Sequence, residues 1–365
     1  MYEGRTVGVV VPAYNESGHV GEVIETIPSY VDRIYAIDDA STDGTWSEIR
    51  EGARRRNGRS PARNGADADR HGTRVVTIRH ERNRGAGGAV KTGYARALED
   101  GMDVVAVMDG DGQMDPAHLE RIIEPVVAGD VTYAKGNRLG HSRDYDAMSR
   151  WRLFGNVLLT MLTRVSSGYW ELSDPQNGFT AISSDGLRLI RFDRLYDRYG
   201  FLNHVLFALN VNRQPIADVS HPARYGDETS TIRYSSFVPR LSTLLARTFL
   251  ERVVRSYVVR RFHPLVGCYA LGALVFLVGT TSGLYSFWAA GVDTFLGGIA
   301  SVTVGTLGLL LVLLGTWFDV AENEGLVRDV ADSRADATGA TAGDRRFGVA
   351  HDGGIPDDRA EGDRR

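Results

Sequence analysis

The chain has 365 residues, of which 43% are hydrophobic and 24% are charged, and its formal net charge is −4. This length allows one large or two modest domains with a sizeable core. The slight excess of acid gives no basis for a general nucleic-acid binder, and the single cysteine, Cys268, excludes a disulfide scaffold and a cysteine-based metal site.

The first 235 residues alternate between short apolar runs and segments with helical spacing. The predicted strands are Thr6–Val11, Arg33–Asp38, Arg74–Arg79, Asp103–Met108 and Val131–Lys135. The predicted helices between them are Gly18–Ile27, Thr45–Arg54, Ala89–Glu99 and Pro116–Val127. This order predicts an α/β fold with a mostly parallel sheet and helices on both faces. Ligands bind such sheets beyond the carboxyl ends of the strands.

One segment interrupts this alternation. Residues 54–73 are rich in arginine, glycine, asparagine and aspartate and contain no large apolar residue. We predict a flexible surface insertion; a patch for nucleic acid or lipid is the alternative interpretation.

Two long apolar runs follow the alternating region. Residues 265–290 and 295–318 carry no charge and are separated by four residues. Each run exceeds the roughly 20 residues that a helix needs to cross a hydrocarbon core. We therefore predict a transmembrane hairpin over residues 263–320, with Trp288 and Trp317 near membrane interfaces. The alternative is a pair of buried helices in a soluble core.

The stretch before the hairpin, residues 236–262, is basic and has apolar residues near helical spacing. Its arginines are Arg240, Arg247, Arg252, Arg255, Arg260 and Arg261, against one acid, Glu251. Positive charges beside a span stay cytoplasmic, so both ends of the chain are expected in the cytoplasm and the protein in the cell membrane with two spans. We predict an amphipathic helix on the membrane surface with its arginines toward lipid head groups; a helix packed on the soluble domain is the alternative.

The two ends of the chain carry weaker signals. Met1–Arg5 has no apolar segment, so no signal peptide is predicted. Residues 321–365, and most clearly those after Asp332, are poor in large apolar residues, so a disordered tail is expected.

Polar and glycine-rich motifs follow the first four predicted strands. They are Pro12–Glu16, Asp38–Gly44, Asn83–Ala89 and Asp109–Gln113. Two aspartates one residue apart on a glycine-containing turn can hold Mg²⁺ or Mn²⁺, which neutralises a diphosphate. Each motif alone could be an ordinary turn or cap, and Gly85–Ala89 fits neither standard nucleotide-binding fingerprint. Together they predict a site for a metal-bound, phosphate-bearing ligand.

In this order the four motifs resemble those of family-2 glycosyltransferases with the GT-A fold, over residues 1–235 and most clearly from residue 5. The resemblance implies an inverting glycosyltransferase whose metal ligands are Asp109, Asp111 and Gln113. The nucleotide-sugar-binding residues that it implies are Pro12, Tyr14, Asn15, Glu16, Ile37, Asp39, Gly88, Asp109, Gly110 and Asp111.

Later motifs are similar to those of the branch that glycosylates polyprenyl or dolichyl phosphate. Gly136-Asn137-Arg138 follows the fifth strand, and Asp174–Phe179 comes later. The resemblance implies that Arg138, Arg152 and Arg224 meet phosphate groups, which suits the planar, permanently charged guanidinium. Asn137 stands where the branch has serine, and the lysine that often follows the late serine is missing. Processive polysaccharide synthases are disfavoured, because Arg150-Trp151 lacks their preceding glutamine and comes before Asp174.

The expected reaction moves a hexose from a UDP- or GDP-sugar to a membrane polyprenyl phosphate. Asp109, Asp111 and Asp174 are the expected catalytic residues, Asp174 either as a base or as a residue that orients the acceptor or the arginines. A lipid phosphate is largely ionised at pH 7, so it needs positioning more than deprotonation. Alternatives are a family-2 enzyme for another glycan or lipid acceptor, a non-catalytic nucleotide-sugar-binding scaffold and a soluble nucleotidyltransferase. Hairpins of this kind can also pair, so a homo-oligomer is a further expectation.

Overall fold

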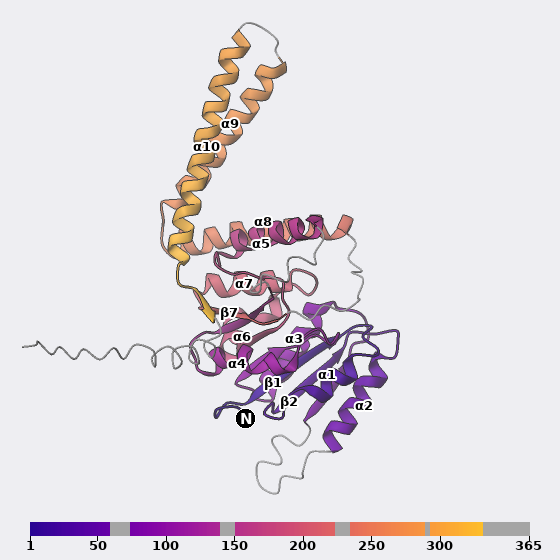
Figure 1. Ribbon diagram of the computed structural model, residues 1–365. Helices are drawn as coiled ribbons and strands as arrows, with labels where there is room; N and C mark the ends of the chain where they lie inside the picture. Colours follow the sequence, from indigo (N-terminus) through magenta and orange to yellow (C-terminus); the bar gives the residue numbers. More distant parts are fainter. Residues whose placement is uncertain (59–73, 139–149, 223–233, 289–292, 331–365) are drawn as a thin grey trace, which may run out of the picture. The chain divides into compact units, whose positions relative to one another are not determined.

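The computed structural model describes residues 1–58, 74–138, 150–222, 234–288 and 293–330. One eight-stranded sheet runs through it, in the order β3-β2-β1-β4-β6-β5-β7-β8 (Figure 1). The strands are β1 (Val7–Ala13), β2 (Arg33–Asp38), β3 (Val75–Arg79), β4 (Val104–Val107), β5 (Tyr133–Asn137), β6 (Thr180–Ser183), β7 (Ile216–Ser220) and β8 (Val327–Val330).

The sheet is mostly parallel, as predicted. β1 pairs in parallel with both β2 and β4, β2 with β3, and β5 with β7. β6 is antiparallel to its neighbours, β4 and β5. The carboxyl ends of β1 to β4 therefore meet at one edge, which is where the four motifs follow their strands.

β1 continues two residues beyond the predicted end. Pro12 and Ala13 pair with Ile37 and Asp38 of β2. The carbonyl oxygen of Pro12 accepts a hydrogen bond from the N–H of Gly110 at 3.1 Å. The N–H and C=O of one residue in a β-strand point toward the same neighbouring strand. The N–H that proline lacks would therefore point toward β4, which has already ended at Val107. A proline is tolerated there.

Helices cover both faces of the sheet. They are α1 (Val20–Thr26), α2 (Thr45–Gly58), α3 (Ala86–Glu99), η1 (Pro116–His118), α4 (Leu119–Val127), α6 (Ser184–Ile190), η3 (Phe192–Arg194) and α7 (Phe201–Val211). Val10 and Ile37 pack with residues of α3 and α7 in one core cluster. Val9 and Val11 point to the opposite face, because side chains alternate along a strand, and both are fully buried. The predicted α/β fold is confirmed.

The predicted insertion begins later than expected. Residues 54–58 are the last turn of α2, not part of a loop. Arg56 donates hydrogen bonds to the carbonyl oxygens of Ile24 and Glu25, both at 2.8 Å, at the end of α1. These contacts extend the helix. The rest of the predicted insertion, 59–73, lies outside the described residues.

Two long apolar helices form a hairpin, α9 (Leu265–Trp288) and α10 (Asp293–Asn323). Both pass length and hydropathy criteria for candidate membrane spans, and only 17% of the most apolar window of each is buried. That exposure is opposite to what two core helices of a soluble protein would show. α10 runs past the predicted end at residue 318, since Asp319 and Asn323 make buried polar contacts that continue the helix.

The predicted tail also begins later than residue 321. Residues 321–323 complete α10, and 327–330 form β8 at the edge of the sheet beside β7. The N–H of Ile216 donates to the carbonyl oxygen of Leu326 at 2.8 Å. Residues 331–365 lie outside the described part of the chain.

The basic stretch before the hairpin is α8 (Tyr234–Val254), followed by a π-helical turn, η4 (Arg255–Val259). α8 packs beside α5 (Arg150–Ser167) and α7 (Figure 1). Its inner face buries Leu241, Leu245 and Val253, while Leu250 and Val254 are exposed. The structure thus shows a helix packed on other helices of the domain, which was the alternative interpretation, and its position on a membrane surface stays a prediction. One expectation was wrong: Arg252 is fully buried and does not face lipid head groups, because it pairs with Asp319 of α10.

Candidate functional site

The turn after β4 places two aspartates at the edge of the sheet. Asp109 and Asp111 flank Gly110, whose N–H bonds to Pro12 of β1. The carboxylate of Asp111 accepts a hydrogen bond from the N–H of Gln113 at 2.9 Å. Gly112 has a φ of +75°, a left-handed conformation that glycine adopts without strain. The turn is thus held by the carboxylate of Asp111 and by the left-handed conformation of Gly112.

The two carboxylates influence each other. The pKa of Asp109 is raised to about 7, mainly by burial and secondly by the charge of Asp111, while the charges of Arg138 and Lys135 act in the opposite direction. A pair of close carboxylates that is short of positive charge favours a bound cation. Among the described residues, no three His, Cys, Asp or Glu side chains come together as a metal site. A metal at this turn would therefore take its remaining ligands from a diphosphate, from water or from Gln113.

The segment Asp174–Phe179 lies directly against Asp109. A Cβ atom at Gly178 would stand 2.7 Å from Oδ2 of Asp109, so any side chain there would displace the carboxylate or the segment. Phe179 is fully buried and anchors the segment at the start of β6. The segment that carries Asp174 therefore lies beside the turn that carries Asp109 and Asp111.

Asp174 and Arg138 form an ion pair. Nε of Arg138 donates to Oδ2 of Asp174 at 2.8 Å, and Nη2 lies 3.4 Å from Oδ1. Asp174 is 5% exposed, whereas the Arg138 side chain is 40% exposed. The carboxylate thus orients a guanidinium that still reaches solvent. Of the other predicted phosphate-binding arginines, Arg152 lies on α5 with its side chain undescribed, and Arg224 lies outside the described residues.

A buried polar cluster behind Asp174 was missed by the sequence analysis. Nζ of Lys135 donates to the carbonyl oxygen of Asn177. The amide of Asn177 also contacts Nε2 of His221 at 2.9 Å, and Asp218 accepts from the N–H of Ser173 at 2.8 Å. Burial lowers the pKa of Lys135 to about 7 and raises that of Asp218 to about 6. One signal was available: Lys135 is one of two lysines in a chain otherwise using arginine.

At the end of β1, Asn15 links the first two motifs. Its φ is +59°, its N–H donates to Oγ of Ser41 at 3.0 Å, and its side-chain oxygen accepts from the N–H of Thr42 at 2.9 Å. The N–H of the next residue, Glu16, donates to Oγ1 of Thr45. Tyr14 is 45% exposed beside this junction. Asn15 and Glu16 thus shape the edge, and Tyr14 presents a ring on it.

Asp39 organises the loop that follows β3. Its Oδ1 accepts from the N–H of Arg84 at 2.9 Å and contacts Nδ1 of His80 at 2.7 Å. Its Oδ2 accepts from the N–H of Gly85 at 2.7 Å. A cavity of about 430 Å³ lies next to it, lined by Ala40, Arg79, His80 and Glu81. The carboxylate therefore holds one wall of a cavity at the ends of β2 and β3.

Besides Gly110, three predicted nucleotide-binding residues place no side chain at this edge. Ile37 is fully buried in the core cluster, and Pro12 is buried in β1. Gly88 packs tightly, since a Cβ there would lie 2.6 Å from Cβ of Arg84. Ile37 supports the sheet from within, and the other two act through backbone and close packing.

The model for "Glycosyl transferase family 2" matches residues 8–191, half of the chain. The chain belongs to glycosyl transferase family 2. The matched residues include all four strand-end motifs, Arg138 and the segment that contains Asp174.

Named proteins are similar in sequence to part of this chain. A UDP-N-acetylglucosamine–dolichyl-phosphate N-acetylglucosaminyltransferase of Methanococcus voltae is 28% identical over 59% of this chain and 84% of its own length. An undecaprenyl-phosphate mannosyltransferase of Micrococcus luteus is 27% identical over 53% of this chain and 72% of its own. Among solved structures, glucosyl-3-phosphoglycerate synthase from Mycobacterium tuberculosis with Mg²⁺ and uridine diphosphate has a TM-score of 0.47 and 21% identity. It covers 68% of this chain and 79% of that one.

The donor atoms of this family-2 chain fit a hard divalent cation. Asp109 and Asp111 offer carboxylate oxygens, which Mg²⁺ and Mn²⁺ prefer. Gly178, which lies against Asp109, adds no side chain that would cover its carboxylate.

Proposed function

We propose that this family-2 glycosyltransferase transfers a hexose from a UDP- or GDP-sugar to a membrane polyprenyl or dolichyl phosphate, with inversion at the anomeric carbon. One observation carries the proposal: the Asp174–Arg138 pair and the Asp109–Asp111 turn lie at one sheet edge, joined by the contact of Gly178 with Asp109. A donor diphosphate and an acceptor phosphate would thus meet there. The names of the relatives from Methanococcus voltae and Micrococcus luteus support the same acceptor class.

The donor would lie across the ends of β1, β2 and β4. We assign the nucleoside to the cavity beside Asp39 and the diphosphate to Asp109 and Asp111, and we expect the exposed ring of Tyr14 to contact the donor. A divalent cation held by these aspartates would neutralise the charge that develops on the leaving diphosphate. Asp39 keeps the Arg84–Gly85 backbone in place beneath the nucleoside.

The acceptor phosphate would bind Arg138. A phosphate oxygen attacks the anomeric carbon and forms a new carbon–oxygen bond, while the bond to the nucleoside diphosphate breaks and its electron pair leaves with the diphosphate. The monoester is mostly ionised at pH 7, so no proton has to be removed first. Asp174 therefore acts by orienting Arg138, and the arginine supplies charge-assisted hydrogen bonds to the phosphate.

The hairpin and the outer face of α8 fit a membrane acceptor. α9 and α10 are candidate spans, and the exposed Leu250 and Val254 of α8 could enter the interface. We place the catalytic domain and the chain beyond α10 in the cytoplasm, because basic residues flank the first span. This arrangement would bring the site to the depth of a lipid phosphate.

A donor screen tests the proposal. Membranes containing the full chain are mixed with polyprenyl phosphate, Mg²⁺ or Mn²⁺, and labelled UDP- and GDP-sugars. We expect label in a lipid that mild acid cleaves, from one donor, and none after treatment with EDTA. Asp109→Asn and Asp111→Asn should each abolish transfer, while Asp185→Asn, at an exposed aspartate on α6, should not.

Two outcomes would contradict the proposal. Label that moves only to a soluble glycan would assign another acceptor to the family-2 domain. Absence of any product, with Asp109→Asn binding the donor as tightly as the wild type does, would favour a non-catalytic scaffold.

A further inference from the structure

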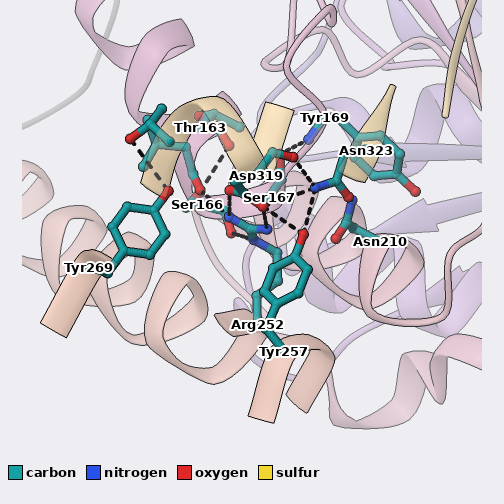
Figure 2. A network of polar contacts seen from close by, with 12 residues as sticks. Thr163, Ser166, Ser167, Tyr169, Asn210, Arg252, Tyr257, Tyr269, Asp319 and Asn323 are labelled. Atoms are coloured by element: carbon teal, nitrogen blue, oxygen red, sulfur yellow. Dashed lines mark hydrogen bonds and ion pairs between the residues drawn. The ribbon is translucent and has the colours of Figure 1, made fainter. Parts of the chain in front are cut away.

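A buried polar network joins the membrane hairpin to the catalytic domain (Figure 2). Asp319 of α10 and Arg252 of α8 form a bidentate ion pair, with Nη1 2.8 Å from Oδ1 and Nη2 2.6 Å from Oδ2. Both side chains are fully buried. The hydroxyl of Tyr257 donates to Oδ1 of Asp319 at 2.7 Å, so the carboxylate is held from two directions.

Arg252 also forms hydrogen bonds with the C-terminal end of α5. Nη2 of Arg252 donates to the carbonyl oxygen of Val165 at 2.9 Å, and Nε donates to that of Ser166 at 3.2 Å. These are carbonyls of the last turn of α5, which lack intrahelical partners. Gly168 follows in a left-handed conformation, with φ +81°, and a Cβ there would lie 2.9 Å from Nη1 of Arg252. Only glycine lets the chain turn so close to the guanidinium.

The chain leads from this point to Asp174 through a short, well-held segment. Nε of Arg164, on α5, donates to the carbonyl oxygen of Leu172 at 2.7 Å. The N–H of Ser173 donates to Asp218 of β7 at 2.8 Å. Asp174 comes next and orients Arg138. A continuous set of contacts therefore runs from α10 to the acceptor end of the site.

Further hydrogen bonds connect the end of α10 to the catalytic domain. The amide of Asn323 donates to the hydroxyl of Tyr257 at 2.8 Å and accepts from the amide of Asn210 on α7 at 3.0 Å. Arg213 donates to the carbonyl oxygen of Glu322 at 2.8 Å. The cytoplasmic end of α10 is thus bonded to α7 as well as to α8.

Stability alone explains this network poorly. Two buried charges lose their hydration, and well-packed apolar residues in their place are often as stable or more stable. A bidentate pair supplies a fixed geometry, which apolar contacts do not.

We propose that Arg252 and Asp319 are positioning residues for the acceptor: the pair fixes the membrane hairpin relative to α5 and so holds the segment bearing Asp174 at a set depth beside the bilayer. This inference rests on the proposed function, since it takes the acceptor to be a lipid phosphate in the membrane. It assigns neither residue to contact with a substrate.

Kinetics of the full chain in vesicles test the inference. The double variant Arg252→Met with Asp319→Leu leaves no unpaired buried charge, so it should still fold, although its unfolding temperature falls because the carbonyl oxygens of Val165 and Ser166 lose a donor. We expect the KM for long-chain polyprenyl phosphate in vesicles to rise at least about 10-fold. The KM for the donor, and turnover of a short-chain soluble polyprenyl phosphate, should not change. Asp185→Asn serves as the control.

Hydrogen exchange gives a second readout that needs no activity. In Asp319→Asn the neutral amide leaves Arg252 without its counterion, and exchange over 165–174 should become faster while exchange in β1 and β2 stays the same. Unchanged exchange there, or a stable double variant with an unchanged KM for the vesicle acceptor, would overturn the inference. Absence of lipid product from the wild-type protein would refute the proposed function instead. The exchange result would still decide whether the Arg252–Asp319 pair holds residues 165–174 in place.

Discussion

The ammonium group of Lys135 donates a hydrogen bond to the carbonyl oxygen of Asn177, three residues beyond Asp174. Lys135 lies on β5, just before Gly136-Asn137-Arg138, so it ties the strand that carries Arg138 to the segment that carries Asp174. It is fully buried, and burial lowers its pKa to about 7, although the nearby carboxylates of Asp174, Asp218 and Asp109 offset part of this effect.

Replacement of Lys135 by methionine should impair both stability and transfer. The carbonyl of Asn177 loses its partner, which costs about 1–3 kcal/mol of unfolding free energy, and the three carboxylates lose a shared positive charge. We expect kcat to fall at least about 10-fold, measured as lipid-linked product. Lys91→Met is a matched control, since Lys91 also bonds to a carbonyl oxygen, that of Leu195 at 2.8 Å, far along the chain from these carboxylates. An equal loss of transfer in both variants would show that Lys135 acts only through stability.

Gly178→Ala should move the segment that carries Asp174 away from the turn that carries Asp109. The added methyl group would stand 2.7 Å from Oδ2 of Asp109, so the carboxylate or the segment has to move. A displacement of about 1 Å near a reacting centre can cost about 100-fold in rate, and we expect a loss of that order in kcat. In Gly58→Ala the new methyl meets no atom within 4 Å, and activity should be retained. Wild-type kinetics in Gly178→Ala would refute the proposed proximity.

Asp39→Asn should weaken donor binding more than turnover. The carboxylate accepts backbone hydrogen bonds from Arg84 and Gly85, and asparagine offers one oxygen in place of two. We expect the donor KM to rise about 10-fold with kcat little changed. Asp43→Asn is the control, because Asp43 accepts from the N–H of Thr45 at the start of α2 and asparagine serves equally well there. A fall in kcat at unchanged KM would place Asp39 in the chemical step instead.

The hairpin should depend on its glycines. A Cβ at Gly308 would lie 2.3 Å from the backbone nitrogen of Phe276, and one at Gly279 would lie 2.3 Å from that of Gly305. Backbone atoms cannot move aside as side chains do, so Gly308→Leu should destabilise the packing of α9 on α10 by about 1–3 kcal/mol or more. Thermal unfolding of the detergent-solubilised chain measures this change. Gly298→Ala, which meets no atom within 4 Å, should unfold like the wild type, and equal stability of both variants would contradict the close approach.

The sequence was most informative where the signal was local. Alternating apolar runs predict the strands, and a parallel sheet gathers their carboxyl ends, so the place of the turn at Asp109 follows from pattern alone. The long uncharged runs likewise predict α9 and α10. Element ends were less certain: β1, α2 and α10 all extend beyond their predicted limits because tertiary contacts continue them.

Pairings between distant residues could not be predicted. Lys135 and Asn177 are 42 residues apart, and Arg252 and Asp319 are 67 apart. Lysine, asparagine, arginine and aspartate are residue types that mostly lie on protein surfaces, so none of these residues taken alone indicates burial. Arg252 was therefore assigned to the lipid surface with its basic neighbours, although its counterion on α10 draws it into the interior.

The position of β8 has a consequence for how the chain is made and handled. The polypeptide leaves the sheet after β7, forms the hairpin, and returns to add an edge strand next to β7. During synthesis the sheet cannot be completed until both apolar helices have emerged from the ribosome, so closure of the sheet edge is a late event that follows the synthesis of the hairpin. A version cut before α9 to obtain a soluble enzyme would leave the backbone of β7 unpaired on that side, and such an exposed edge invites aggregation. A soluble form would instead need a short linker from η4 to residue 324, so that the returning strand is kept.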